Sequence, residues 1–127
     1  MALATSLEIY KQSSALLSLA VDVQANIPRA FRASMGTRIA DECVDLLVLI
    51  GRANAARIAD DRAMHIARLL EHLEVAVLLL RVAHDKKLIS TKLWSTSITL
   101  TDSVGKQANG WLKHARTTRS TPATPAA

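Results

Sequence analysis

The sequence predicts an all-α protein: one antiparallel four-helix bundle with up-down-up-down topology. Half of the residues are hydrophobic, yet the chain holds only one Phe, one Tyr and two Trp, so Ala, Leu, Val and Ile supply the apolar surface. Pro and Gly are scarce before the C-terminal end, which favours helices. Four apolar patterns of helical period follow one another with short connections, as in a bundle of antiparallel neighbours. At 127 residues the chain forms one domain.

The first helix is expected over residues 6–25. Thr5 and Glu8 have the spacing of a capping box, in which a hydroxyl and a carboxylate bond the free backbone N–H groups of the first turn. Pro28 ends the helix, because the residue before a proline is pushed out of the helical region. The apolar positions at helical spacing are Ile9, Leu16, Leu19, Ala20 and Val23.

The second helix is expected over residues 29–56. Pro28 suits its start, where no N–H partner is required. Its core face consists of Phe31, Met35, Ile39, Cys43, Leu46 and Ile50. The opposite face is interpreted as a solvated, ion-paired surface, with a binding surface as the alternative. That face carries Arg38, Asp41, Asp45 and Arg52.

The third helix is expected over residues 60–84, with Asp60 and Asp61 at its positive end and Lys86 and Lys87 after its negative end. Its core stripe consists of Ile66, Leu69, Leu70, Leu73, Val77 and Leu80.

The fourth helix is expected from the N-cap Ser90 to about Ala115. Its core stripe consists of Leu93, Leu100, Val104, Ala108 and Trp111. Residues 1–115 are therefore assigned to the bundle. Residues 116–127, rich in Thr, Pro and Ala, are expected to form a disordered tail.

Apolar residues outside these stripes predict a homo-oligomer. A helix that is apolar all round should be buried, and in so small a domain the natural cover is another subunit. The second helix contributes Val48 and Leu49 to this excess. On the third and fourth helices the expected interface residues are Val75, Leu78, Leu79, Val82, Trp94, Ile98 and Leu112. The number of subunits does not follow from this pattern.

The charge balance favours an acidic partner, nucleic acid first. Lys and Arg number 16 against 11 Asp and Glu, for a net charge of +5. Lys92, Lys106 and Lys113 are separated by whole heptads and share one helical face, which Arg116 extends. Lysines hold phosphates as point charges and do not read base sequence. A stripe that only keeps the protein soluble is the alternative.

Arginines at the start of the second helix form a competing site. Arg29 and Arg32 lie one helical turn apart, where they either cap or pair with carboxylates of a neighbouring subunit, or bind a partner's phosphates. Arg38 has Asp41 and Glu42 nearby, so its charge is expected to be compensated locally.

No catalytic, metal or cofactor site is expected. The histidines form no i, i+4 pair and no Glu-x-x-His motif, the spacings that metal sites in helices use. Cys43 lies in an apolar pattern without a nearby His, which indicates a buried thiol and not a nucleophile. The chain has neither a run of about 20 apolar residues nor the cationic start of a signal peptide. A cytoplasmic protein without membrane contact is the expectation.

Several short segments, in order and spacing, resemble the accessory variability determinant family of diversity-generating retroelements. The resemblance spans residues 7–114. Its parts include Ile27-Pro28-Arg29, Gly36-x-Arg38-Ile39, Leu79-Leu80-Arg81, Leu88-Ile89-Ser90 and Gly110-Trp111-Leu112. That family belongs to a wider four-helix group, which includes proteins encoded by intervening sequences of ribosomal RNA genes.

The resemblance implies a pentameric barrel with a basic surface that associates with a reverse transcriptase and with RNA or DNA. The residues that match basic positions of the family pattern are Arg29, Arg32, Arg38, Arg81 and Lys113. The leading hypothesis is a non-catalytic nucleic-acid-binding accessory subunit. The alternative is a structural or protein-interaction bundle of the ribosomal intervening-sequence type, with no direct nucleic-acid role.

Overall fold

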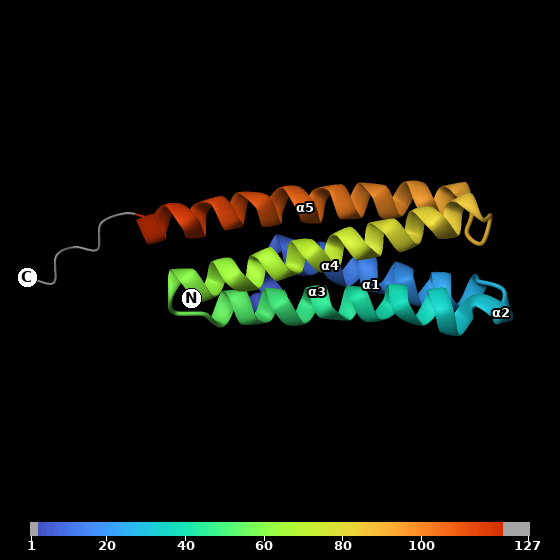
Figure 1. Cartoon of the computed structure of the whole chain (residues 1–127), viewed down its shortest axis with the longest axis horizontal. Coiled ribbons are helices and arrows are strands. Elements are labelled where there is room, and N and C mark those ends of the chain that lie inside the picture. Colours follow the sequence, from blue (N-terminus) through green and yellow to red (C-terminus); the bar gives the residue numbers. More distant parts are fainter. Residues whose placement is uncertain (1–2, 121–127) are drawn as a thin grey trace, which may run out of the picture.

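The chain folds into four long antiparallel helices (Figure 1). The structure is a computed structural model that describes residues 3–120. Its elements are a 3-10 turn η1 (Ala4–Ser6), α1 (Glu8–Asn26), α2 (Arg29–Phe31), a π turn η2 (Arg32–Gly36), α3 (Thr37–Ala55), α4 (Ala59–Asp85) and α5 (Thr91–Ser120). No strand occurs among the described residues. The predicted all-helical architecture is therefore confirmed.

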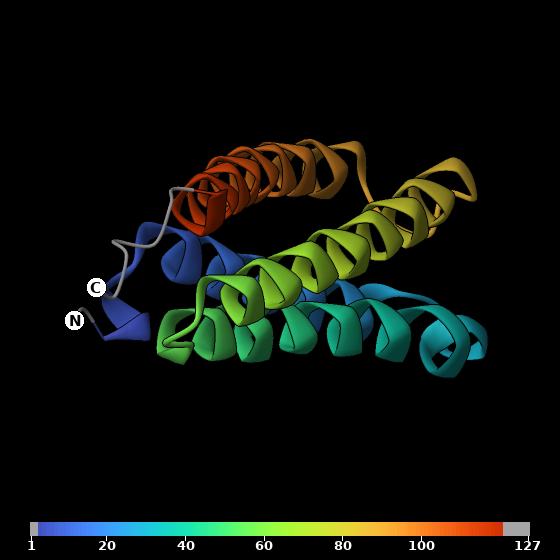
Figure 2. The ribbon, with the colours of Figure 1, turned by 60° about the vertical axis from the view of Figure 1, so that its left-hand side comes forward.

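The helices follow one another around a square. Both α3 and α5 pack against α1 and against α4, so the α1–α3 face lies opposite the α4–α5 face (Figure 2). The up-down path places the α1–α3 and α4–α5 connections at the same end of the bundle (Figure 1). We call this the connection end. The α3–α4 connection lies at the other end.

The core runs along the middle of the square, and most of the predicted stripes face it. The apolar positions predicted for the first helix are all buried, and α3 and α4 each bury four of their predicted positions: Ile39, Cys43, Leu46 and Ile50, and Ile66, Leu69, Leu73 and Leu80. The contribution of α5 is smaller in volume. Its buried residues include Ser97, Thr101, Val104 and Ala108.

The helix boundaries show which local signals acted. Ile27 is extended and ends α1, as expected before Pro28. Ser90 caps α5: its Oγ accepts a hydrogen bond from the Leu93 N–H at 3.1 Å. The predicted capping box is wrong, because Leu7 is the N-cap of α1 and Thr5 lies in the preceding 3-10 turn.

The second predicted helix is interrupted by the π turn. The Thr37 N–H bonds the Arg32 carbonyl five residues earlier, and the Thr37 hydroxyl donates to the same oxygen at 3.1 Å. The wider turn rotates the segment before it relative to α3. Phe31, predicted to face the core, is consequently 43% exposed, whereas Met35 is half-buried.

Two predicted outward residues face the core instead. Leu112 is 8% exposed and follows Ala108 by four residues, so it continues a face that small and polar residues define. The position of apolar residues alone therefore predicted an outward side chain for Leu112, which is wrong. Leu49 is 5% exposed, because it lies on the same face as the buried Leu46 and Ala53. Leu112 therefore does not point outward from the protomer as predicted.

Helix α5 continues past Ala115 to Ser120, so the first part of the expected tail is helical. The remainder, residues 121–127, lies outside the described residues. Within residues 3–120, no helix combines the length and the apolar character that crossing a membrane requires.

Candidate nucleic-acid and assembly surfaces

Exposed cations from several elements gather at the connection end. Arg29 belongs to α2, Arg38 to the start of α3, Arg81 to the last turns of α4, and Lys92 to the start of α5. The α4–α5 connection adds two lysines that were not predicted as binding residues. We call the set the connection-end cluster, and it consists of Arg29, Arg38, Arg81, Lys86, Lys87 and Lys92.

The two added lysines could have been found from topology. In an up-down bundle alternate connections meet at one end, so Lys86 and Lys87 had to lie near the Pro28 corner. Lys87 also has a positive φ of 59°, in the left-handed region that ends helices.

Arg32, a predicted binding residue, has a structural role. Its Nε donates to the Ile27 carbonyl at 3.1 Å, and an Nη donates to the Ala25 carbonyl at 3.2 Å. These carbonyls lie where α1 ends, and a charged donor there is favourable. The capping alternative is therefore the one that the structure supports.

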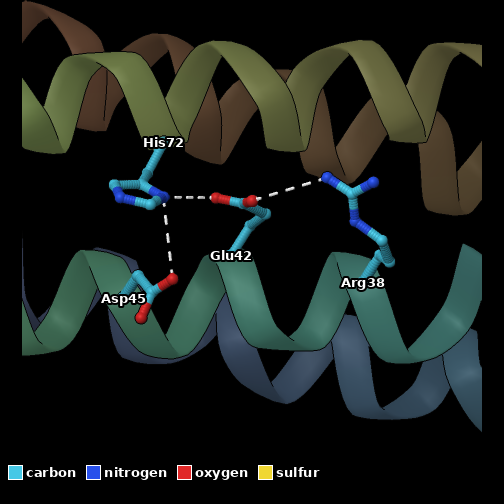
Figure 3. A network of polar contacts seen from close by, with 4 residues as sticks. All are labelled: Arg38, Glu42, Asp45 and His72. Carbon is cyan, nitrogen blue, oxygen red and sulfur yellow. Dashed lines mark hydrogen bonds and ion pairs between the residues drawn. The ribbon is translucent and has the colours of Figure 1, made fainter.

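Arg38 lies next to a carboxylate, as predicted. Its Nη lies 3.9 Å from Glu42 Oε1, and the other Glu42 oxygen lies 2.5 Å from His72 Nδ1 (Figure 3). The His72 nitrogen also lies 3.6 Å from Asp45 Oδ2. This network joins α3 to α4 along one edge of the bundle.

Arg81 and His84 cover the indole of Trp94. The His84 and Trp94 rings are stacked, with centroids 5.3 Å apart and an interplanar angle of 11°. The Arg81 guanidinium carbon lies 6.0 Å from the Trp94 centroid, at cation–π distance. Trp94 is therefore engaged within the protomer.

The predicted stripe on the fourth helix is exposed but long. Lys92, Lys106, Lys113 and Arg116 are all exposed on α5. Lys92 and Lys113 lie about 32 Å apart along the helix axis, at 1.5 Å per residue. The structure therefore separates the predicted basic residues: Lys92 joins the connection-end cluster, and Lys113 and Arg116 lie toward the opposite end.

The outward side of α4 carries the first apolar surface. Leu78 is 59% exposed and Val82 is 37% exposed, while Val75 and Leu79 are half-buried. Beside them an open groove of about 450 Å³ runs between α4 and α5. Its apolar lining consists of Leu70, Leu73, Val77, Trp94 and Ile98.

A second apolar surface lies on the α1–α3 face and was only partly predicted. Val48 is 42% exposed, as expected, and Val44 is 43% exposed one turn before it. Val21 on α1 is 52% exposed. By helical spacing these three valines lie on the sides of α1 and α3 that flank the groove between them, opposite the α4–α5 face.

Cys43 is the free cysteine, and it is buried in the core. Burial, with a smaller contribution from the charge of Glu42, raises the pKa of its thiol from 9.0 to about 12. The thiol is thus protonated at neutral pH, which does not suit a nucleophile.

Comparison with known proteins identifies the family. Residues 7–115 match the family model described as bAvd-like, that is, accessory variability determinant-like. No curated protein and no solved structure gives a significant match. The matched range agrees with the span of the resemblance found in the sequence, while the link to ribosomal intervening sequences stays a prediction. Because the match covers most of the chain and includes residues of all four long helices, the chain belongs to the bAvd-like family.

Proposed function

We propose that the protein is a non-catalytic accessory subunit of a retroelement, which binds the phosphate backbone of RNA or DNA beside a reverse transcriptase. Family membership supports the retroelement role. The observation that carries nucleic-acid binding is the connection-end cluster. Four carboxylates, those of Asp22, Asp41, Glu42 and Asp85, lie near the same end against six cations, so the cluster retains an excess of positive charge.

Binding through this cluster would be insensitive to base sequence. Lysine and arginine contacts to phosphates position a nucleic acid, whereas sequence is read at base edges. Stacking of single-stranded bases needs free aromatic faces. Trp94 already stacks on His84, which leaves Phe31, 43% exposed, as the available ring at this end. We therefore expect electrostatic binding, weak for one protomer and strongly dependent on salt.

Assembly into a ring would strengthen this binding. The protomer has two different apolar surfaces, one on the outward side of α4 around Leu78 and one on α1 and α3 around Val48. A contact between unlike surfaces is heterologous, and repeating it generates a closed ring or an open filament. The resemblance favours a pentameric ring. Cyclic symmetry brings one cluster per subunit to the same side, which raises avidity.

The competing function is a structural bundle that binds only protein. The two apolar surfaces favour it, because they suit protein contacts without any role for the basic residues. The two hypotheses differ in one readout: only the first predicts salt-dependent binding of the oligomer to nucleic acid.

Binding of the intact protein to RNA and to duplex DNA, measured by fluorescence anisotropy over a range of salt concentrations, tests the proposal. We expect affinity to fall as salt rises and to change little with base sequence. An oligomer that binds neither nucleic acid in low-salt buffer would favour the structural bundle. A second test concerns the gene's neighbourhood, where a reverse-transcriptase gene and a near-duplicate template and variable repeat are expected. Their absence would remove the retroelement role and leave nucleic-acid binding untouched.

A further inference from the structure

Three side chains that can ligate a metal ion meet across the α3–α4 contact (Figure 3). Glu42 and Asp45 lie one turn apart on α3, and His72 reaches them from α4. One donor atom from each residue lies within 4.8 Å of the other two. His72 Nδ1 faces both carboxylates, at 2.5 Å from Glu42 Oε2 and 3.6 Å from Asp45 Oδ2.

We propose that Glu42, Asp45 and His72 bind a divalent first-row transition-metal ion, with Zn²⁺ as the test case. Imidazole nitrogen and carboxylate oxygen are ligands that Zn²⁺ accepts at about 2.0–2.2 Å. Donors of a tetrahedral ion of that size lie about 3.4 Å apart. The Asp45–His72 separation of 3.6 Å is already close to this value. The Glu42 oxygen has to move away from the imidazole by about 1 Å.

The charges of the cluster also fit a divalent ion. With a neutral imidazole, the three ligands carry two negative charges, and the Glu42 side chain is only 13% exposed. Arg38 approaches Glu42 on the other oxygen, so the oxygen that faces His72 is left for the ion. Mg²⁺ and Ca²⁺ prefer sites made of oxygen alone and gain little from the imidazole.

The position of the cluster defines what the ion would do. The side chains of Asp45 and His72 are 48% and 37% exposed, so an ion can enter from solvent and retain water as further ligands. Because its ligands come from two helices, the ion would fasten α3 to α4. A ligand that binds only the folded state raises its stability. This role does not depend on the nucleic-acid proposal.

Local spacing could not reveal this site. Glu42 and His72 are separated by 30 positions and meet only through the pairing of α3 with α4. The i, i+4 histidine pair and the Glu-x-x-His motif place both ligands on one helix. Their absence does not bear on a site whose ligands come from two helices.

The test is a calorimetric titration of the intact protein, first treated with a chelator, with Zn²⁺ and separately with Mg²⁺. We expect the titration to show one Zn²⁺ bound per protomer. In a separate thermal unfolding measurement, Zn²⁺ should raise the unfolding midpoint and EDTA should reverse the rise, whereas Mg²⁺ should cause none. Loss of an outer-shell partner weakens metal sites about 10–100-fold, so His72→Asn and Asp45→Asn should weaken binding at least about tenfold. Arg38→Gln should strengthen binding, because it removes a nearby positive charge.

The matched control is His114→Asn, which removes an exposed imidazole from α5 and should leave Zn²⁺ binding unchanged. Asp45→Asn keeps the test decisive even if the other variants unfold, because Asp45 does not take part in the short Glu42–His72 bond. Two results would overturn the proposal: no saturable binding of one Zn²⁺ per protomer, or equal affinity in the parent and in Asp45→Asn.

Discussion

Gly36 lies directly against Gln24, where the π turn brings the start of α3 onto the end of α1. A Cβ atom at position 36 would lie 3.0 Å from the Gln24 Cγ and 3.2 Å from its Cα. The second of these is backbone, which cannot swing aside. The Gln24 amide also donates to the Thr37 hydroxyl at 3.2 Å, and this bond fixes the side chain at the contact. Glycine at this position therefore sets how closely the two helices approach.

Gly36→Ala should destabilise the protein by about 1–3 kcal/mol, the usual cost of overpacking. The control is Gly51→Ala in the adjoining helix α3, where a Cβ would meet nothing within 4 Å. That change should stabilise by about 0.5–1 kcal/mol, because alanine is the better helix former. Urea unfolding of both variants measures the difference. Equal effects of the two substitutions would show that the contact with Gln24 is not tight.

Arg62 should be needed for its forked geometry and not only for its charge. Its Nε donates to the Ala53 carbonyl at 3.0 Å, and an Nη donates to the Ala56 carbonyl at 2.5 Å, at the end of α3. Lysine has one nitrogen and no planar fork, so it does not reproduce the two bonds that Nε and Nη make, and Arg62→Lys should cost about 1.5–3 kcal/mol. Arg68→Lys, at an exposed position of α4, is the matched control and should change the free energy of unfolding little. A loss shared by both variants would contradict the capping role.

Cys43 should make stability fall at alkaline pH. Its folded pKa of about 12 lies above the ordinary value of 9.0, so the folded state holds the proton more tightly. Below pH 9 both states are protonated and the effect is absent. Between pH 9 and 12 the unfolded thiol ionises first, and stability should decrease by at most about 1.4 kcal/mol per pH unit. Chemical unfolding at several pH values, compared with Cys43→Ala, measures this slope. An identical pH dependence in the variant would exclude Cys43 as its source.

The two apolar faces predict a result from mixing variants. Leu78→Glu on the α4 surface and Val48→Glu on the α1–α3 surface should each break the oligomer with little loss of helix, because both side chains are substantially exposed. Each variant keeps one intact face. If the contact joins unlike faces, the two variants mixed should form a one-to-one dimer in light scattering. Dissociation by only one of the substitutions, or no dimer in the mixture, would contradict a heterologous ring.

The sequence was sufficient for the parts of the fold that depend on local chemistry. Pro28 and Ser90 mark helix ends for reasons that act within a few residues, and both predictions are confirmed. The π turn was not predictable in this way, because it depends on the approach of Gly36 to Gln24 in another helix. Leu112 was misplaced because Ser97 and Thr101 define the core face of α5 although they are not apolar.

The candidate sites likewise include contacts that local spacing predicts and contacts that depend on the packing of distant segments. The pairing of Arg38 with Glu42 was predictable from a spacing of four residues, and it is present. The capping bonds of Arg32 reach only five and seven residues back and were predicted as one alternative. The cluster of Glu42 and Asp45 with His72, in contrast, depends on the pairing of α3 with α4. The membership of Lys86 and Lys87 in the connection-end cluster lies between these cases, since it follows from topology once the helix order is known.

The central claim, backbone binding by the connection-end cluster, is tested most directly by the slope of log affinity against log salt. Two triple variants remove equal charge: Arg29, Lys86 and Lys87 to Gln at the connection end, and Lys11, Lys106 and Lys113 to Gln elsewhere on the exposed surface. Each lost phosphate contact should reduce the slope by about 0.7–0.9. We expect the connection-end variant to lose about 2–3 units of slope per protomer while the oligomer persists, and the second variant to bind like the parent. Parent-like binding by the connection-end variant at every salt concentration would contradict the claim.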